Sequence, residues 1–320
     1  MMMFSVNDII KHISSEYKIE GDSSLQCSSM SSIFDSESGS LSFIREDIAD
    51  SESIVCNSKA SVIICYQSFI PPKELIKKKC FIMVANPSST FLNLIKVFYK
   101  DKYEFPHIIH NTASVSPKAK IGTNVHIGEN VIIGNAEIGD NTIIKPFSIV
   151  HDNVFIGKNV LISEYCNIGG EGFSHISNAE GHPENFLHIG KVIIEDYVEI
   201  FPYTNVDRAT LSVTKIGKHT KIDHFCHIGH NTRVGEDTII TAKVVMCGGS
   251  SIGDKCWIGV GSIIKDSVVV GNNIIIGMGS SVTKSVPDNQ TWLGSPARPI
   301  KEFLELQKRN KELIDEMKSK

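Results

Sequence analysis

The sequence predicts a mainly β fold, a parallel β-helix of hexapeptide repeats, on three observations. An aliphatic residue, once replaced by Met246, returns every six positions from Ile216 to Val282. A small or β-branched residue follows each of them four places later, from Thr220 to Val286. The pattern continues without a break, and a six-residue period is typical of stacked coils. Three repeats make one triangular coil, so residues 18 apart should lie on neighbouring parallel strands, about 4.8 Å apart.

The same period begins at Ile109, with one shortened, five-residue step after Ile133 that should reduce one corner and leave the stacking intact. It is lost over residues 169–191 and again, more briefly, over 209–212. In all, the repeats predict between eight and nine coils. We interpret the long interruption as a loop ejected from one coil, because insertions in repeat proteins map to loops and often to the binding face.

Three segments follow from where the period begins and ends. Residues 1–107 lack it and are expected to form a small α/β domain. Residues 108–286 should form the β-helix. Pro287 ends the repeats, and residues 287–320 should form a turn followed by an amphipathic helix.

Local signals organise the first segment. Ser5 and Asp8 can cap a first helix, and Asn86-Pro87-Ser88 can introduce a later one. The short apolar runs at 61–66 and 80–85 favour buried strands. The serine-rich stretch at 23–53 is predicted to form loops and edge strands.

Composition narrows the class of protein. The net charge of -4 gives no general basic footprint for nucleic acid, and no stretch approaches the length of apolar chain that spans a membrane. We therefore expect a cytoplasmic protein. The eight cysteines form no CxxC pair, and Cys166, Cys226 and Cys256 fall in the small inward slot of their repeats, so packing is favoured over metal or disulfide roles.

The stretch KIDHFCHIGHNTRVG at 221–235 resembles the catalytic coil of the left-handed β-helix acyltransferases, specifically the LpxD-like N-acyltransferases of nucleotide-linked amino sugars. The resemblance extends over nearly the whole chain, through GGEGF at 169–173, VDRAT at 206–210 and VVMCGGSSIG at 244–253. It implies a left-handed helix, a nucleotide-sugar-binding domain at residues 1–107, a homotrimer with active sites between chains, and acyl transfer from a thioester to an amine.

His230 and Gly248 are the expected catalytic residues. The family's base aligns with His230, and an imidazole of ordinary pKa can accept a proton from an amine near neutral pH. Gly248 lies 18 residues after His230, so the coil rule places the two side by side. Its backbone N–H, unobstructed by a side chain, could stabilise an oxyanion, which is also the role that the resemblance implies.

Substrate binding is expected at Phe43, Glu171, Phe173, His224 and His227, where the two histidines could orient either the substrate or the base. The family stacks uracil between two aromatic residues, and its second aromatic position aligns with Ala49. This departure suggests the same reaction on another sugar nucleotide, linked to dTDP or UDP. Enzymes of the anthrose-pathway AntD kind are one such class, although no motif singles them out.

The last repeats resemble coenzyme A-dependent hexapeptide acyltransferases. Gly261 and Gly279 could admit pantetheine, although tight corners could equally require them, and Lys284, Arg298 and Lys301 could contact phosphates. We expect acyl-CoA as co-substrate and no permanently bound cofactor or metal. The alternative is an LpxD proper, which takes its acyl group from an acyl carrier protein and acts on UDP-3-O-acylglucosamine in lipid A synthesis.

Two readings from other classes remain open. A zinc β-helix enzyme resembling γ-carbonic anhydrase would gather three histidines across a subunit interface, with His182, His219 and His224 as candidates. A non-catalytic sugar-nucleotide-binding protein would have no use for His230 as a base.

Overall fold

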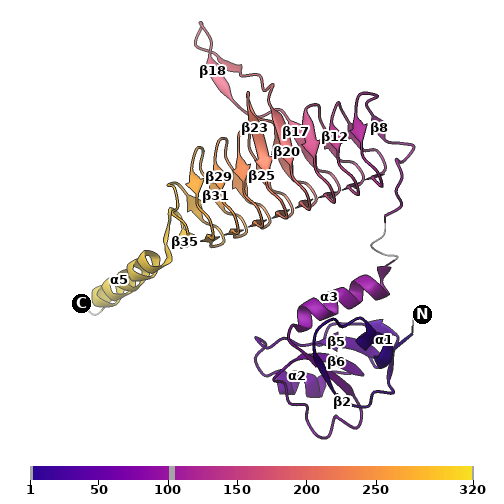
Figure 1. Ribbon diagram of the computed structural model, residues 1–320. Coiled ribbons are helices and arrows are strands. Elements are labelled where there is room, and N and C mark those ends of the chain that lie inside the picture. The colour runs from indigo at the N-terminus through magenta and orange to yellow at the C-terminus, as the bar shows by residue number, and fades with distance from the viewer. Residues whose placement is uncertain (1–2, 101–104, 319–320) are drawn as a thin grey trace. The chain divides into compact units, whose positions relative to one another are not determined.

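The computed structural model describes residues 3–100 and 105–318, and the chain divides into two compact units, Met1–Glu104 and Phe105–Lys320 (Figure 1). The division falls within a few residues of the boundary expected at 107. Each unit is described by itself.

The first unit is a five-stranded mixed sheet with helices. The sheet runs in the order β2 (Tyr17–Gly21), β7 (Cys80–Val84), β6 (Val62–Tyr66), β5 (Ser40–Phe43), β4 (Ser29–Met30). A separate pair joins β1 (Phe4–Ser5) to β3 (Gln26–Cys27), and the helices are α1 (Val6–Lys11), α2 (Ser51–Asn57) and α3 (Pro87–Phe98). One apolar cluster includes residues of α1, α3 and the sheet, and a second includes Val55 of α2.

The sequence signals of this unit are confirmed with one exception. Ser5 and Asp8 form a capping box at α1, and Asn86 caps α3 by accepting from the N–H of Ser89. The exception is α2, whose first residues lie in the stretch predicted as loops and strands. Its N-cap, Asp50, has a left-handed backbone and makes no side-chain cap bond, so the usual signal of a helix start is missing.

The second unit contains the predicted left-handed parallel β-helix, made of three sheets. We name its faces after one outward residue of each. The Lys221 face comprises β10 (His126–Ile127), β13 (Ile143–Ile144), β16 (Leu161–Ile162), β21 (Glu199–Ile200), β24 (Lys221–Ile222), β27 (Ile239–Ile240), β30 (Trp257–Ile258), β33 (Ile275–Ile276), β35 (Thr291–Gly294) and β36 (Ala297–Pro299).

The His227 face comprises β8 (Ser114–Val115), β11 (Ile132–Ile133), β14 (Ile149–Val150), β17 (Asn167–Gly170), β22 (Asn205–Asp207), β25 (His227–Ile228), β28 (Val245–Met246), β31 (Ile263–Ile264) and β34 (Ser281–Val282). The Arg233 face comprises β9 (Lys120–Ile121), β12 (Glu137–Ile138), β15 (Val154–Ile156), β20 (Lys191–Ile194), β23 (Val213–Ile216), β26 (Arg233–Val234), β29 (Ser251–Ile252) and β32 (Val269–Val270). Nine strands on the His227 face put the coil number at the upper end of the expected range.

The 18-residue rule is confirmed by the strand register. His227 pairs with Val245 and Val245 with Ile263, and every repeat residue from Ile216 to Val282 is at most 3% exposed. Where the repeat shortens after Ile133, the register drops to 17 residues, as in Ile133 with Val150, and the stack continues. Inward hydroxyls add bonds between coils, since Thr220 and Thr238 donate to the carbonyls of Gly235 and Gly253.

The long interruption forms an arm. Its strands β18 (His175–Ser177) and β19 (Pro183–Asn185) pair as a hairpin that extends away from the stack of coils (Figure 1). The coil resumes in register, because Ile168 still pairs with Val206. The expected loop is therefore confirmed, and its paired strands are an addition to the prediction.

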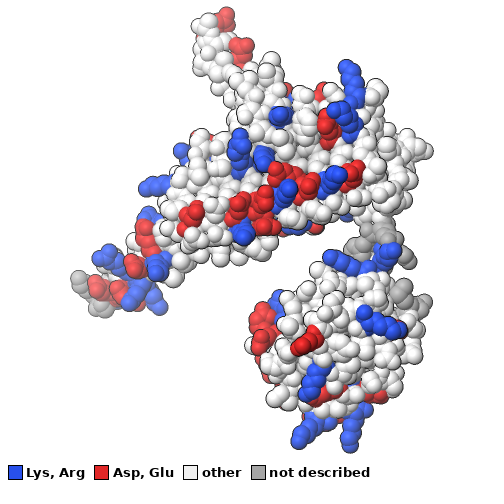
Figure 2. Space-filling view, in the orientation of Figure 1, with Lys and Arg blue, Asp and Glu red and all other residues white. Residues whose placement is uncertain are grey.

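The C-terminal helix is also confirmed as α5 (Ile300–Lys318), and before it a tight turn between Gly294 and Ala297 joins β35 to β36. Acidic and basic side chains are intermixed along the β-helix and on α5 (Figure 2). Among the described helices, none combines the length and the apolar character needed to cross a membrane.

The fold predicts a clear contrast on β11. Ile133 is 2% exposed and its neighbour Ile132 is 49% exposed. Ile133→Ala should lower the free energy of unfolding by about 2–5 kcal/mol, because it leaves a cavity in the core. Ile132→Ala should lower it by less than about 1 kcal/mol. Urea denaturation of the two variants checks this, and equal losses would contradict the assignment of the inward column.

Candidate functional site

His230 and Gly248 meet at one corner of the β-helix. His230 follows β25 and Gly248 follows β28, so they occupy equivalent positions on successive coils, between the His227 and Arg233 faces. A Cβ built on Gly248 would lie 2.5 Å from Nε2 of His230, far inside ordinary contact. The imidazole therefore lies directly against Gly248, and no other residue type fits there without moving the ring.

The amide of Gly248 is free in the part of the chain that the structure describes. The neighbouring amides are used, since Cys247 N–H donates to Ile264 O and Gly249 N–H donates to His230 O at 2.8 Å. A free N–H beside an imidazole has the geometry of an oxyanion donor next to a base. Both predicted catalytic residues are thus brought together by the structure.

Asn231 fixes the ring plane of His230. Its Oδ1 accepts from the N–H of Thr210 and its Nδ2 donates to Thr210 Oγ1, which orients the amide. Nδ2 then faces Nδ1 of His230 at 3.0 Å. An Nδ1 that accepts this bond places the hydrogen of the neutral ring on Nε2, so the ring must exchange that hydrogen before Nε2 can take a proton from an amine.

The ejected loop reaches this corner through residues that the repeat pattern did not identify. His188 is fully buried in its side chain, and its ring packs edge-on against that of His230, with centroids 5.0 Å apart. Glu171, an expected substrate residue, lies with Oε2 3.8 Å from Nδ1 of His188. Phe173, which was also expected to bind substrate, is 84% exposed and contacts His175, not His188.

A row of amides leads along the His227 face to a buried carboxylate. Asn167 Oδ1 accepts from Nε2 of His151 at 2.8 Å, and Asn167 Nδ2 donates to Oδ1 of Asn205 at 2.7 Å. Asn205 then donates to Oδ1 of Asp207 at 2.6 Å and approaches Nδ1 of His227 at 3.2 Å. His227 is thereby held beside Asp207, with Nε2 3.6 Å from its Oδ2.

The electrostatics of this corner favour a neutral base. Burial lowers the pKa of His230 below its usual 6.5, positive charge on His188 or His227 lowers it further, and Asp207 acts in the opposite direction. Burial raises the pKa of Asp207 above 3.8, although Asn205 and the three nearby histidines oppose the shift. The VDRAT motif pointed to this segment, but the burial of Asp207 could not be deduced from it.

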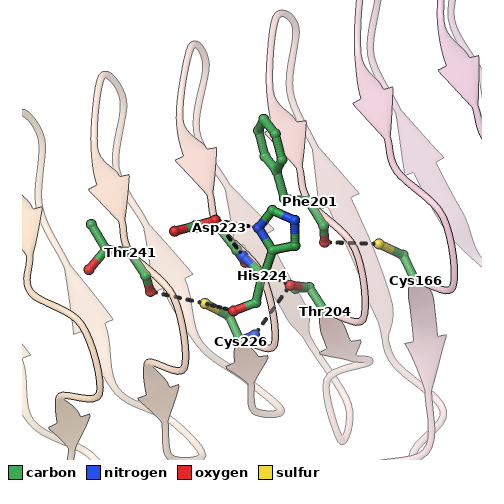
Figure 3. A network of polar contacts seen from close by, with 7 residues as sticks. All are labelled: Cys166, Phe201, Thr204, Asp223, His224, Cys226 and Thr241. Atoms are coloured by element: carbon green, nitrogen blue, oxygen red, sulfur yellow. Dashed lines mark hydrogen bonds and ion pairs between the residues drawn. The ribbon is translucent and has the colours of Figure 1, made fainter. Parts of the chain in front are cut away.

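His224 lies at another corner, between the Lys221 and His227 faces. Its Nδ1 is 2.6 Å from Oδ1 of Asp223, and its backbone N–H donates to the same oxygen (Figure 3). Burial would raise the pKa of Asp223, but these bonds and the charge of His224 hold it below 3.8. The structure therefore separates His224 from His230, while His227 lies on the face between them.

The inward cysteines pack as expected. Cys166 and Cys226 donate from Sγ to the carbonyls of Phe201 and Thr241, one coil further on (Figure 3). Burial raises the pKa of these thiols to about 12 and about 11, so neither is a thiolate near neutral pH.

Four of the five residues expected to contact acyl-CoA fall into two pairs, and the fifth, Lys301, does not line the pocket that the second pair shares. Gly261 and Gly279 are stacked at the corner of His224, and a Cβ at either would meet open space. Lys243 occupies the same column with φ 61°, so the backbone does not demand glycine there. Lys284 and Arg298 line one pocket of about 160 Å³, which Glu302 shares through its bond to Arg298.

The first unit has its own cavity at Phe43. It measures about 260 Å³ and is lined by Ser32, Ile33, Phe34, Phe43, Ile44, Arg45 and Ile48. Phe34 is 65% exposed, so this pocket has a second aromatic residue even though the aligned position is Ala49. Phe34 was missed from the sequence because it lies in an irregular stretch, and whether this pocket binds the nucleotide stays a prediction.

The zinc reading finds no support from one chain. His219 stacks on Tyr197 at a different corner from His224, and His182 lies on the arm. Within residues 3–100 and 105–318, no group of three potential ligands gathers around a common point.

Comparison with known proteins identifies the repeats. The family described as "Bacterial transferase hexapeptide (six repeats)" matches residues 135–170 and 214–248, and "Hexapeptide repeat of succinyl-transferase" matches 250–284. All three matches lie in the β-helix.

Curated relatives are named as acyltransferases. A UDP-3-O-acylglucosamine N-acyltransferase of Campylobacter lari is 29% identical over 94% of this chain and 96% of its own length. One of Rhizobium meliloti is 34% identical over 47% of this chain, which spans less than half, 42%, of that protein.

Solved structures agree in the β-helix. The UDP-N-acetylglucosamine acyltransferase of Francisella novicida has a TM-score of 0.56 and 27% identity, over 60% of this chain and 69% of that one. LpxA of Acinetobacter baumannii has a TM-score of 0.54 and 28% identity, over 60% of this chain and 72% of that one.

The buried carboxylate of Asp207 is expected to lower the stability of the folded protein when it is ionised. A raised pKa means that Asp207 binds its proton more tightly when folded, so its ionised form near pH 8 lowers stability. Asp207→Asn should raise the free energy of unfolding at about pH 8, and the gain should shrink as the pH falls toward about 4. Asp266→Asn, on the exposed surface, should show no such trend. Urea denaturation across this range checks it, and a destabilised Asp207→Asn at about pH 8 would contradict it.

Proposed function

We propose that this chain, a hexapeptide-repeat acyltransferase, moves an acyl group from a thioester to the amino group of a nucleotide-linked amino sugar. The observation that carries the proposal is the corner where the ring of His230 lies against Gly248, whose N–H has no acceptor among the described residues. A base and an oxyanion donor at van der Waals contact are what acyl transfer to an amine requires.

In the proposed reaction, the free amine attacks the thioester carbonyl and forms a carbon–nitrogen bond. The carbonyl oxygen becomes an oxyanion, which accepts a hydrogen bond from Gly248 N–H. His230 takes the proton that the attacking nitrogen loses. When the tetrahedral intermediate collapses, the carbon–sulfur bond breaks and His230 returns the proton to the leaving thiolate, so the products are an amide and a thiol.

The lowered pKa of His230 fits this sequence of steps. A ring that is neutral at neutral pH has one unprotonated nitrogen, and Nε2, which lies against Gly248, becomes that nitrogen once the ring hydrogen has moved to Nδ1. Asp207, the buried carboxylate nearby, then stabilises the imidazolium that forms. His227, whose Nε2 lies 3.6 Å from Oδ2 of Asp207, is proposed to orient the acceptor, and Glu171 of the ejected loop is proposed to contact the acceptor as well.

For the acceptor, we favour a UDP-linked glucosamine that already carries a 3-O-acyl group. A relative aligned over nearly the whole chain is named for that substrate, and the cavity at Phe43 offers two aromatic residues for a base. Another UDP- or dTDP-linked amino sugar is the second candidate, because Ala49 removes the aromatic residue that the family places there. The anthrose-pathway kind belongs to this second candidate.

For the donor, acyl carrier protein and acyl-CoA are both proposed. If the acceptor is the UDP-linked 3-O-acylglucosamine, we propose acyl carrier protein as the donor. Lys284 and Arg298 in one pocket favour a phosphate-bearing group, which both donors possess. Gly261 and Gly279, with open space above them, could admit its pantetheine arm.

We also propose a cytoplasmic homotrimer. Support comes from side chains that one chain leaves uncovered. At the corner of His224, four aromatic rings stack in a column with centroids about 5 Å apart and each is roughly half exposed: Phe147, Tyr165, Tyr203 and Phe225. A second copy packed on this column would cover it.

The base assignment makes a sharp prediction. His230→Ala should lower kcat by about 10²–10⁴-fold with a confirmed acceptor, because general-base catalysis is lost. The matched control is His219→Ala, an exposed ring at another corner, which should keep wild-type turnover. Release of free thiol measures both. Full activity in His230→Ala would contradict the mechanism, and loss of activity in His219→Ala would favour the zinc reading.

The proposed nucleotide pocket at Phe43 makes a second prediction. Phe34→Ala should raise the KM for the nucleotide sugar about 10-fold and leave kcat within about threefold, because stacking of a base on an aromatic ring contributes about 1–3 kcal/mol. Ile70→Ala, an 85% exposed residue of the same unit, is the control. Steady-state kinetics measure the effect. An unchanged KM would remove Phe34 from the binding site.

A further inference from the structure

His188 is an unusual residue for a loop. Its side chain has no exposed surface, and neither ring nitrogen has a hydrogen-bond partner within the described residues. A neutral imidazole presents one donor and one acceptor, and leaving a buried polar group unpaired costs about 1–3 kcal/mol. A buried ring kept at this cost therefore needs an explanation.

The surroundings of His188 provide that explanation. Its ring contacts the ring of His230 edge-on, at an interplanar angle of 66°. Gly172 closes over both residues, because a Cβ there would lie 2.7 Å from Nε2 of His188 and 2.8 Å from Cβ of His230. The loop therefore packs against His230, with Gly172 at its Cβ and the ring of His188 against one side of its ring.

Glu171 is the nearest candidate partner for the ring of His188. Its Oε2 lies 3.8 Å from Nδ1 of His188, beyond hydrogen-bond distance by less than 1 Å, and the carboxylate is 55% exposed and able to move. A small rotation would pair it with His188. A carboxylate behind an imidazole commonly fixes the orientation of that ring.

We propose that His188 is a positioning residue for His230, holding the base against Gly248 by direct packing and tying it through Glu171 to the ejected loop. The inference rests on the proposed function, in which His230 is the base. It also gives the interruption of the repeat a role, since the loop delivers one wall of the site.

Charge supports the geometry. The titratable groups that face His230 are His188 and Glu171 from the loop, Asp207 from β22 and His227 from β25. Positive charge on His188 lowers the pKa of His230, whereas the carboxylate of Asp207 raises it. Removing one or the other should therefore move the titration of His230 in opposite directions.

The test begins with the titration of His230 in the full-length protein. Histidines labelled with ¹³C at Cε1 are followed by NMR, and the His230 signal is the one lost in His230→Ala. We expect the midpoint to rise in His188→Gln and to fall in Asp207→Asn. His182→Gln, on the exposed arm, should leave it unchanged. A midpoint that stays at its wild-type value in a folded His188→Gln protein would overturn the proposal.

Kinetics supply the second readout. His188→Gln should lower kcat about 10- to 100-fold with an acceptor KM within about threefold of wild type, the split expected when a group acts on the base and not on binding. If His188→Gln fails to fold, Glu171→Gln replaces it, since that carboxylate is exposed. A lowered kcat at constant KM supports positioning, and an unchanged kcat counts against it.

The two arms separate this inference from the proposed function. The NMR titration uses no substrate. A shifted His230 signal in a protein that acylates none of the amino sugars tested would overturn the proposed function and leave the coupling of His188 to His230 standing. If the enzyme is active but His188→Gln leaves both the His230 signal and kcat unchanged, the proposed function stands and the positioning role of His188 is overturned.

Discussion

The rest of the structure depends on the stacking of successive coils at a fixed repeat of 18 residues. Backbone bonds between coils keep each aliphatic residue above its equivalent, as Ile228 lies above Val206 and below Met246. Because side chains alternate between the two sides of a strand, a slip of one residue would turn this buried column outward. The register is therefore held firmly, and residues far apart in the chain meet at predictable corners.

The candidate site arises where this regularity is interrupted. The regular stack alone supplies His230, Gly248 and His227. The longer of the two interruptions adds Glu171, Gly172 and His188, which close over one side of the base. The shorter one, just after Asp207, contains Thr210, which forms two hydrogen bonds with the side chain of Asn231. Regular coils thus set the distance between base and oxyanion donor, and the irregular segments provide burial, charge and fixed orientation.

This division explains what the sequence could predict. The period gave the β-helix, its shortened step and the contact of His230 with Gly248, because one register governs all of them. His188 and Phe34 were beyond reach, because they lie in segments without a period whose path depends on tertiary packing. The burial of Asp207 was likewise hidden, since it depends on the loop that covers the corner. The helix α2 was missed because its start lacks a side-chain cap.

The central claim is that acyl transfer takes place at the contact between His230 and Gly248. The most direct measurement is a crystal structure of the protein with a non-hydrolysable acyl thioester analogue and a nucleotide-linked amino sugar. The account predicts the acyl oxygen within about 3 Å of Gly248 N and the acceptor amine within hydrogen-bond reach of the ring of His230. An acyl group bound at another corner, such as that of His224, would contradict it.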